Sequence, residues 1–321
     1  MHSNNRQRGF SLIELMIAMT IGLILLAAVI ALVTNSSRTQ RHVEQVGEQI
    51  ENGRYALDLL RREVQHAGYY GEYYDVRAPS NSSDPPPDPC TTDPDQIEED
   101  IGLPIQGYDS VNGDPDPSCL SDDDHRDGTD ILVLRRASTS KTDVADLTSG
   151  ELYIQSLSIN KIIEIAGGSD NESTFDLEKL DNTRANIRKL RTDIYFIGPD
   201  GNDVPTLKRL SLVDDGGDLT WREEPLATGV ENMQIEYGVD SDGNGTAHDY
   251  ETDPGTVGDW ADVIALRVHL VVRTRDASEG YTDTKTYDVG LEGTYDPPDD
   301  GHRRRVYSNS MRATNPSMRR E

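Results

Sequence analysis

The sequence predicts an α+β protein, in which one long N-terminal α-helix packs on a domain built from an antiparallel β-sheet. Two observations predict this class. Apolar residues recur at helical spacing over the first 70 residues, and after residue 128 short segments alternate apolar and polar residues. Helix-like segments do not intervene between the later strand-like segments, which disfavours a doubly wound parallel fold.

Composition limits the partners of this chain. Its 321 residues carry a formal net charge of −27, with 58 acidic against 31 basic side chains. Nucleic acids and anionic membranes require Lys and Arg to neutralise phosphate, so we expect no nucleic-acid partner. The acidity suits a saline or cation-rich exterior.

A single long apolar segment covers residues 10–33. Its 24 residues would span roughly 36 Å as a helix, which is enough to cross a bilayer once. A cleaved secretory signal has a shorter apolar region and a small-x-small site, for which Ala27-Ala28 is a poor match. Arg6 and Arg8 precede the segment. The positive-inside rule therefore predicts a cytoplasmic N-terminus, with the residues after the segment exported.

One carboxylate, Glu14, interrupts the apolar segment. A charged side chain costs about 2.5 to 3.5 kcal/mol at the centre of a membrane helix, so Glu14 requires a partner or an interfacial position. Cleavage between Gly9 and Phe10 would create a cationic amine near Glu14 of the same chain or of a neighbouring helix. The alternative is an ordinary single-pass anchor with a Glu near its cytoplasmic end.

The stretch GFSLIE, residues 9–14, resembles the processing site of type IV prepilins and pseudopilins. In that family a membrane peptidase cuts after the glycine and methylates the new N-terminus, and the glutamate guides entry into the filament. The resemblance implies that residues 1–9 form a leader peptide and that Gly9 and Phe10 flank the cut. It also implies that Phe10 is N-methylated and that Glu14 acts in assembly.

Beyond the apolar segment, residues 34–70 are predicted to continue the helix with one apolar stripe. Its members recur at spacings of three and four: Val43, Val46, Ile50, Gly53, Leu57, Leu60, Val64 and Ala67. A coiled coil is the alternative, but the stripe is short and contains Gly53, which favours packing on the chain's own domain. Gly68 and the turn-rich residues after it end the helix.

Residues 71–127 are predicted to be a long excursion outside the core, because prolines and acidic runs oppose regular structure there. Cys90 and Cys119 are the only cysteines. Outside the cytoplasm we expect them to form a disulfide worth roughly 3 to 4 kcal/mol by loop entropy. Counting alone also allows a reduced pair.

Residues 128–321 are predicted to form the antiparallel sheet domain. Its strand-like segments are short, β-rich and bounded by Gly, Asp or Pro; they cover residues 129–138, 151–159, 161–167, 191–198, 206–213, 218–224, 231–239, 262–275 and 284–293. The stretch LVDDGGDLTW predicts a hairpin, because Gly216 and Gly217 tolerate the positive φ of a two-residue turn.

Three stretches of this domain resemble, in order and spacing, minor pilins of the PilW type: residues 128–138, 229–245 and 302–315. J-type pseudopilins of type II secretion systems share the stem helix, but residues 234–245 and the arginine-rich ending favour the pilus protein. The terminal arginines are either solvated charges on an edge strand or partners of the domain's surplus carboxylates.

The resemblance implies a minor pilin that helps to prime pilus assembly at or near the filament tip, with roles in adhesion and twitching motility. It implies as partners other minor pilins, the major pilin, the prepilin peptidase, the inner-membrane platform protein and a large tip adhesin. Before assembly the protein would cross the inner membrane once, with a periplasmic C-terminal domain; afterwards it would belong to the surface pilus. A J-type pseudopilin and a tethered binding module that keeps its leader are the alternatives.

The stretch DSDGNGTAHDYE, residues 240–251, matches the calcium-loop pattern D-x-[DN]-x-[DN]-G-x5-E. Asp240, Asp242, Asn244 and Glu251 would supply side-chain oxygens, and Thr246 would supply a backbone carbonyl. Calcium is the cofactor that such hard ligands favour. The segment before the loop is strand-like, so the flanks of an EF-hand are absent, and a solvated β-turn is the alternative.

Catalytic signatures such as HExxH, CxxC, GxSxG, the P-loop and GxGxxG do not occur in the sequence, so we expect no enzyme. His269 alternates within a strand-like segment and is predicted to be a strand-face residue rather than a base. Trp221, Trp260 and the tyrosines are expected in the core and on sheet faces. A binding stripe of tyrosines around residues 69–74 is the alternative.

Overall fold

The computed structural model describes residues 11–74, 76, 83–111, 113, 117–121, 124–167 and 170–319. Its helices and antiparallel sheets confirm the predicted α+β class. The chain divides into two compact units, residues 1–48 and residues 49–321. The predicted leader, Gly9 and Phe10 lie outside the described residues.

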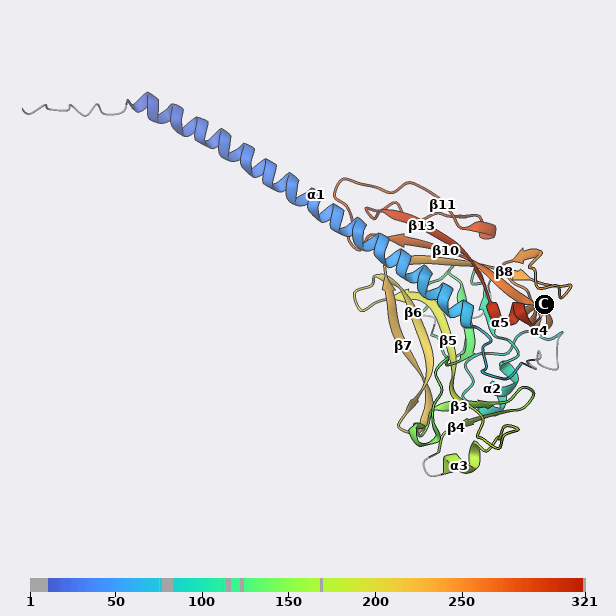
Figure 1. Cartoon of the computed structure of the whole chain (residues 1–321). Helices are drawn as coiled ribbons and strands as arrows, with labels where there is room; N and C mark the ends of the chain where they lie inside the picture. The colour runs from blue at the N-terminus through green and yellow to red at the C-terminus, as the bar shows by residue number, and fades with distance from the viewer. Residues whose placement is uncertain are drawn as a thin grey trace, which may run out of the picture. The chain divides into compact units, whose positions relative to one another are not determined.

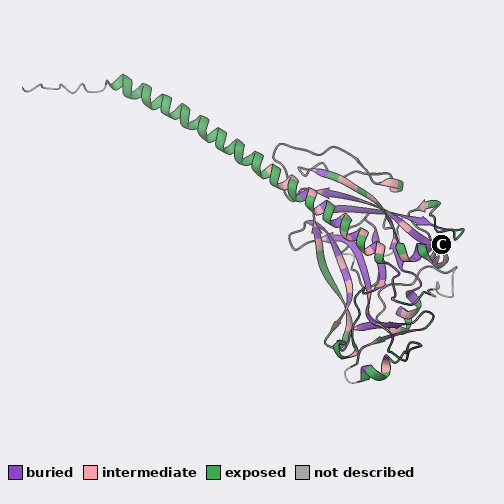
Figure 2. Ribbon diagram, in the orientation of Figure 1, coloured by how far each residue is buried: buried purple, intermediate pink, exposed green. Residues whose placement is uncertain are grey.

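The helix α1 (Leu12–His66) contributes to both units. In the first unit, no described residue is buried, as the exposed colouring of this part of α1 shows in Figure 2. In the second unit, α1 buries one stripe, made of Gln49, Gly53, Ala56, Leu60 and Val64. The stripe that the sequence predicts is confirmed at Gly53, Leu60, Val64 and Ala67, whereas Leu57 is only half-buried.

The earlier part of the predicted stripe is wrong. Val43 is exposed, and Val46 and Ile50 are only half-buried. Burial begins at Gln49, a polar residue whose Nε2 donates to the carbonyl oxygens of Val272 (2.6 Å) and Arg303 (2.8 Å). These bonds attach α1 to two strand ends of the second unit, so a polar side chain opens the buried stripe.

The larger sheet has seven strands, all paired antiparallel. In hydrogen-bonded order these are β1 (Ile105–Tyr108), β2 (Ile131–Ala137), β5 (Ile187–Pro199), β3 (Leu152–Ser156) and β4 (Lys161–Ile165), with β6 (Pro205–Asp215) beside β5 and β7 (Asp218–Thr228) beside β6. The predicted hairpin is confirmed: Asp215 pairs with Asp218, and Gly216 and Gly217 between them both have positive φ.

The smaller sheet has the antiparallel order β13 (Arg304–Arg312), β10 (Val263–Arg273), β8 (Val230–Val239) and β9 (Asp249–Glu251). The segment between β10 and β13, residues 274–303, contains the short pair β11 (Tyr287–Asp288) and β12 (Thr294–Tyr295). It covers one face of the sheet, and we call it the strap. Short helical turns complete the unit: α2 (Pro94–Asp100), η1 (Val144–Asp146), α3 (Asn171–Thr174), α4 (Val257–Ala261), η3 (Gly290–Glu292) and α5 (Thr314–Met318). Figure 1 shows their arrangement.

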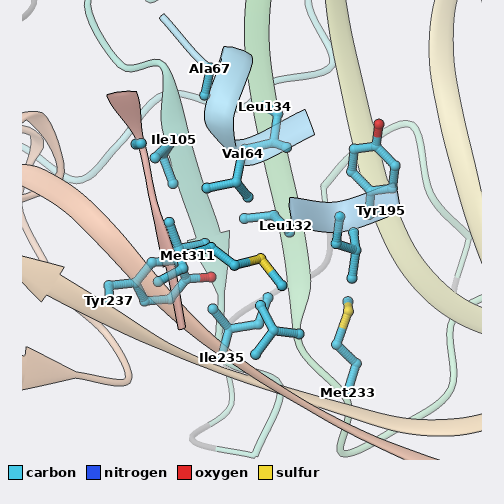
Figure 3. Close-up of a cluster of buried hydrophobic side chains, with 14 of the residues drawn as sticks. Val64, Ala67, Ile105, Leu132, Leu134, Tyr195, Met233, Ile235, Tyr237 and Met311 are labelled. Carbon is cyan, nitrogen blue, oxygen red and sulfur yellow. The ribbon is translucent and has the colours of Figure 1, made fainter. Parts of the chain in front are cut away.

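The main core lies between the two sheets and the second-unit part of α1. It joins side chains of α1, β1, β2, β5, β8, β10 and α4 in one apolar cluster. Figure 3 shows Val64 of α1 beside Leu132 and Leu134 of β2, with Met233 and Ile235 of β8 in the same cluster. The helix is therefore a structural part of the domain.

The predicted excursion over residues 71–127 is wrong in part. The helix α2 and the strand β1 both lie within it, and β1 extends the larger sheet by pairing with β2. Leu103 and Ile105 are fully buried in the main core. The strand β1 has only four residues, which lie between prolines and acidic residues. It forms because β2 supplies the hydrogen-bond partners of its backbone. The sheet therefore begins before residue 128.

Candidate assembly site

Apolar side chains cover α1 from Leu12 to Val33 in the first unit. Every Leu, Ile, Met and Val from Leu12 to Val33 is more than half exposed. By length and composition α1 is apolar enough to cross a membrane. A helix that is apolar all round requires lipid or other apolar helices as its environment.

The hydroxyl groups of Thr20 and Thr34 in α1 are satisfied within the helix. Thr20 Oγ1 lies 3.1 Å from the carbonyl oxygen of Met16, and Thr34 Oγ1 lies 2.9 Å from that of Ile30. Each threonine donates to the preceding turn and needs no water. This arrangement suits a hydrocarbon environment, where every polar group must find an internal partner.

Glu14 is the only charged residue from Leu12 to Ser37. Its Oε2 accepts the backbone N–H of Ser11 at 2.9 Å. This is one half of a capping box, in which the third helical residue returns to the N-cap backbone. The carboxylate thus satisfies a free N–H group at the positive end of the helix dipole. The pattern S-x-x-E at residues 11–14 signals this cap, and the prediction of an amine partner overlooked it.

The structure contains a disulfide between Cys90 and Cys119, whose Cα atoms are 5.3 Å apart. The two cysteines pack against the face of the larger sheet that carries Ile131, Val133 and Ile194. Trp221 Nε1 on β7 donates to the carbonyl oxygen of Cys90 at 3.1 Å. The disulfide therefore closes a segment that contains α2 and β1, rather than a loop outside the core.

The predicted calcium loop is a network of internal hydrogen bonds. The two carboxylate oxygens of Asp240 accept the backbone N–H groups of Asn244 (3.0 Å) and Gly245 (2.9 Å). Asn244 Nδ2 lies 2.9 Å from Asp242 Oδ2 and 2.9 Å from His248 Nε2. Arg312 Nη2 donates to the carbonyl oxygen of Gly245 at 3.3 Å.

The predicted calcium ligands do not form one oxygen shell in the structure. Glu251 belongs to β9 and pairs with Tyr237 of β8. In the part of the chain that the structure describes, no three His, Cys, Asp or Glu side chains are placed to hold a metal ion. The donor types suit calcium, but Asp240, Asp242 and Glu251 are not gathered around one point. Calcium binding by these residues, with Asn244 and Thr246, stays a prediction.

The arginine-rich ending has partners inside the second unit. The side chain of Arg304 is fully buried and contacts three carboxylates: Glu231 of β8, Asp283 (3.3 Å) and Asp300 (2.7 Å) of the strap. Hydrogen bonds from Arg304 lower the pKa of Asp300 to about 2. Of the two interpretations of the terminal arginines, the one in which they pair with carboxylates therefore holds for Arg304, which is not a solvated charge.

The last residues of the chain cap the C-terminal end of α1. Asn315 Nδ2 donates to the carbonyl oxygen of Ala67 at 3.0 Å, and Arg319 Nη2 donates to that of Gly68 at 2.5 Å. The helix itself supplies no N–H donor to these carbonyl oxygens. The positive charge of Arg319 near them also complements the negative end of the helix dipole. The C-terminus thus fixes the end of the stem helix.

The remaining sequence candidates are structural. His269 lies on β10 with its Nδ1 2.8 Å from Ser308 Oγ on β13, which confirms a strand-face residue. Trp260 and Tyr70 are buried. Tyr69 and Tyr73 pack partly against an apolar cluster, and only Tyr74 in this group is exposed. Residues 69–74 therefore do not present an exposed stripe of tyrosines.

Comparison with known protein families gives two matches. Residues 194–315 match the family described as Type IV Pilus-assembly protein W, and residues 4–30 match the Prokaryotic N-terminal methylation motif. These matches make parts of the chain similar to PilW-type pilins and to the N-terminal segment of methylated prepilins. The first match runs from within β5 to α5, and the second includes Gly9, Phe10, Glu14 and most of the apolar segment. No curated protein and no solved structure matches the chain.

The two matches cover different parts of the chain. The methylation motif together with the exposed apolar helix indicates membrane anchoring. The region of the first match contains the smaller sheet and, from the larger sheet, β6, β7 and the second part of β5. This family consists of structural pilin-type proteins and is no enzyme class, and its members relate to the type IV pilus and its other components.

Proposed function

We propose that this chain is a PilW-type minor pilin that helps to prime assembly of the type IV pilus and sits at or near its tip. The exposed apolar part of α1 supports this proposal most strongly. It carries one carboxylate, Glu14, which follows the proposed cut between Gly9 and Phe10 within the matched methylation motif. A surface of this kind requires either lipid or the stems of other pilins. The proposal includes no catalytic role.

Burial of the helix would drive assembly. Before assembly the apolar segment lies in the inner membrane, with the N-terminus in the cytoplasm and the second unit in the periplasm. The prepilin peptidase cuts after Gly9 and methylates Phe10. The segment then moves into a helical bundle, where Glu14 exchanges its bond to the Ser11 N–H for a neighbour's amine.

The partners follow from this pathway. The inner-membrane platform protein would receive the processed chain, other minor pilins and the major pilin would pack against α1, and a large tip adhesin would contact the second unit during adhesion and twitching motility. The match to a pilus-assembly family favours this function over a J-type pseudopilin of a type II secretion system. Neighbouring pilus or secretion genes would separate the two.

N-terminal sequencing of the protein extracted from the envelope tests the processing step. We expect the mature chain to begin at an N-methylated Phe10, because the methylation motif covers this position. Replacement of Gly9 should leave the leader attached. A mature chain that begins at Met1 would remove the basis of the pilus proposal.

Replacement of Glu14 by Ala tests the assembly step. We expect normal cleavage but fewer pili and reduced twitching, because the amine of a neighbour loses its acidic partner. Glu44 of the same helix, which accepts from Gln40 at 3.1 Å and lies outside the apolar segment, provides the matched control. Glu44→Ala should assemble normally. Normal pilus number in Glu14→Ala would contradict the role of Glu14.

A further inference from the structure

Two buried amide side chains on β8 have oxygens without hydrogen-bond partners. Met233 and Ile235 of this strand point into the main core, so Asn232 and Gln234 point to the opposite face of the smaller sheet. Both are nonetheless buried, with 3% of each residue exposed. Within the described chain, neither Asn232 Oδ1 nor Gln234 Oε1 has a donor.

The orientation of both amides is fixed by one backbone carbonyl. Asn232 Nδ2 donates to Gly128 O at 3.1 Å, and Gln234 Nε2 donates to the same oxygen at 2.9 Å. If either amide were rotated by half a turn, its oxygen would face the Gly128 oxygen, and two acceptors would repel each other. The nitrogens therefore face Gly128, and the amide oxygens are left without donors.

A carboxylate lies beside these amides. Asp130 is buried, its N–H donates to Met233 O at 2.9 Å, and its Oδ2 accepts the N–H of Ile235 at 2.7 Å. The segment 128–130 thus runs along β8 and brings a negative charge next to Asn232 and Gln234. Buried amide oxygens without donors, such as those of Asn232 and Gln234, are satisfied in native proteins by ordered water or by an ion.

From this arrangement we propose that Asn232, Gln234 and Asp130 form a buried site for a hard metal cation, such as Ca²⁺ or Na⁺. Amide and carboxylate oxygens are the ligands that these ions take. The loop at residues 240–251 differs, because none of its described side-chain oxygens is buried without a hydrogen-bond partner. The oxygens without donors lie on β8, so this face is the better cation site of the two.

The alternation of polar and apolar residues in 231–239 explains why the sequence did not predict this site. Polar residues at 232, 234 and 236 alternate with apolar residues at 233, 235 and 237, which is typical of a strand with one solvated face. Gly128, whose carbonyl oxygen accepts from both amides, lies more than 100 residues earlier in the chain, so the pattern of β8 does not reveal this contact.

Cation-dependent thermal unfolding of the full chain in detergent tests the proposal. After treatment with a chelator and desalting into a potassium buffer, Ca²⁺ and Na⁺ are titrated separately, and bound metal is measured by elemental analysis. We expect one of the two ions to raise Tm to a saturating value, with about one ion bound per chain. Asp242→Ser, in the loop at 240–251, should keep the whole effect.

Gln234→Glu and Gln155→Glu give a matched pair of variants. Gln155 is also a buried strand glutamine, but its Oε1 accepts Leu177 N–H at 3.0 Å and its Nε2 donates to Leu177 O at 3.2 Å. We expect Gln234→Glu to lose stability without the cation and to regain it with the cation, since the added charge strengthens binding. Gln155→Glu should lose stability under both conditions.

Each remaining outcome overturns the proposal. If neither ion binds or raises Tm, the site holds water only. If Asp242→Ser abolishes the response while Gln234→Glu leaves it unchanged, the cation binds in the loop at 240–251. Both results leave the pilus proposal untouched, because processing and assembly are measured separately.

Discussion

Gly53 is a position in this protein where the absence of a side chain is structurally required. It lies in the buried stripe of α1, where a Cβ atom would come within 2.5 Å of Tyr307 Cε2 on β13. Real side chains do not tolerate such an approach, so the ring of Tyr307 and the helix fit together only while residue 53 has no side chain. The close approach of α1 to β13 therefore depends on a glycine inside a helix, where glycine is otherwise unfavourable.

Gly53→Ala is expected to destabilise the second unit by about 1 to 3 kcal/mol, because overpacking displaces the Tyr307 ring. Gly47 provides the matched control, since nothing lies within 4 Å of the Cβ position there. Gly47→Ala should be neutral or slightly stabilising through helix propensity. Urea unfolding followed by tryptophan fluorescence compares the two. Equal stability of the two variants would show that the Tyr307 contact does not constrain the helix.

At the scale of elements, local patterns predicted most of the sheets. The strands β2, β5, β6, β8 and β10 alternate or concentrate apolar residues strongly enough to be read from the sequence. The strand β1 was missed because it has four residues between prolines and acids and owes its order to β2. The onset of burial at Gln49 was missed for the same reason, since its two acceptors lie more than 200 residues away.

The partners of Arg304 were also beyond sequence reasoning. Pairing with surplus carboxylates was one of two readings of the arginine-rich ending, but the residues that pair come from β8 and from the strap. Asp283 accepts from Tyr281, Tyr287 and Arg304, so the strap is held to the sheet through one buried guanidinium. This network forms only when β8, the strap and β13 come together in the fold. A local sequence pattern therefore cannot predict it.

Arg304→Met is expected to destabilise the second unit by about 3 to 5 kcal/mol near neutral pH, because it leaves Glu231 and Asp283 without their main buried cation. The loss should shrink in acid. The folded pKa of Asp300, about 2, lies below its unfolded value, so its stabilisation is present above about pH 4 and is lost as the pH falls through about 2.

Arg305→Met is the control for this substitution, since Arg305 is the next residue on β13 and is exposed. Its stability and pH dependence should match those of the wild type. Denaturant unfolding at pH 7 and pH 3 measures both variants. The same loss for Arg304→Met at the two pH values would mean that the network is not the source of the effect.

At the scale of the whole molecule, the chain separates an exposed apolar unit from a folded acidic unit. None of the described residues of the first unit is buried, whereas α1 from Gln49 onward supplies part of the main core. Figure 2 shows the same change from exposed to buried colouring along the chain. The exposed apolar surface and the stable fold therefore occupy different parts of one helix, so that removal of the apolar segment need not disturb the fold.

A chain that begins at residue 45 should therefore fold without a membrane, because it keeps Gln49 and every buried residue of α1. We expect a soluble protein that unfolds cooperatively and contains the Cys90–Cys119 disulfide when it is produced in an oxidising compartment. A chain that begins at residue 69 is the control. It lacks Ala56, Leu60 and Val64, which are all fully buried in the main core, so the sheets lose their apolar cover and the protein should aggregate. Circular dichroism and size-exclusion chromatography distinguish these outcomes. Aggregation of the longer chain would show that the second unit requires the apolar segment for folding, and the separation between assembly surface and fold would not hold.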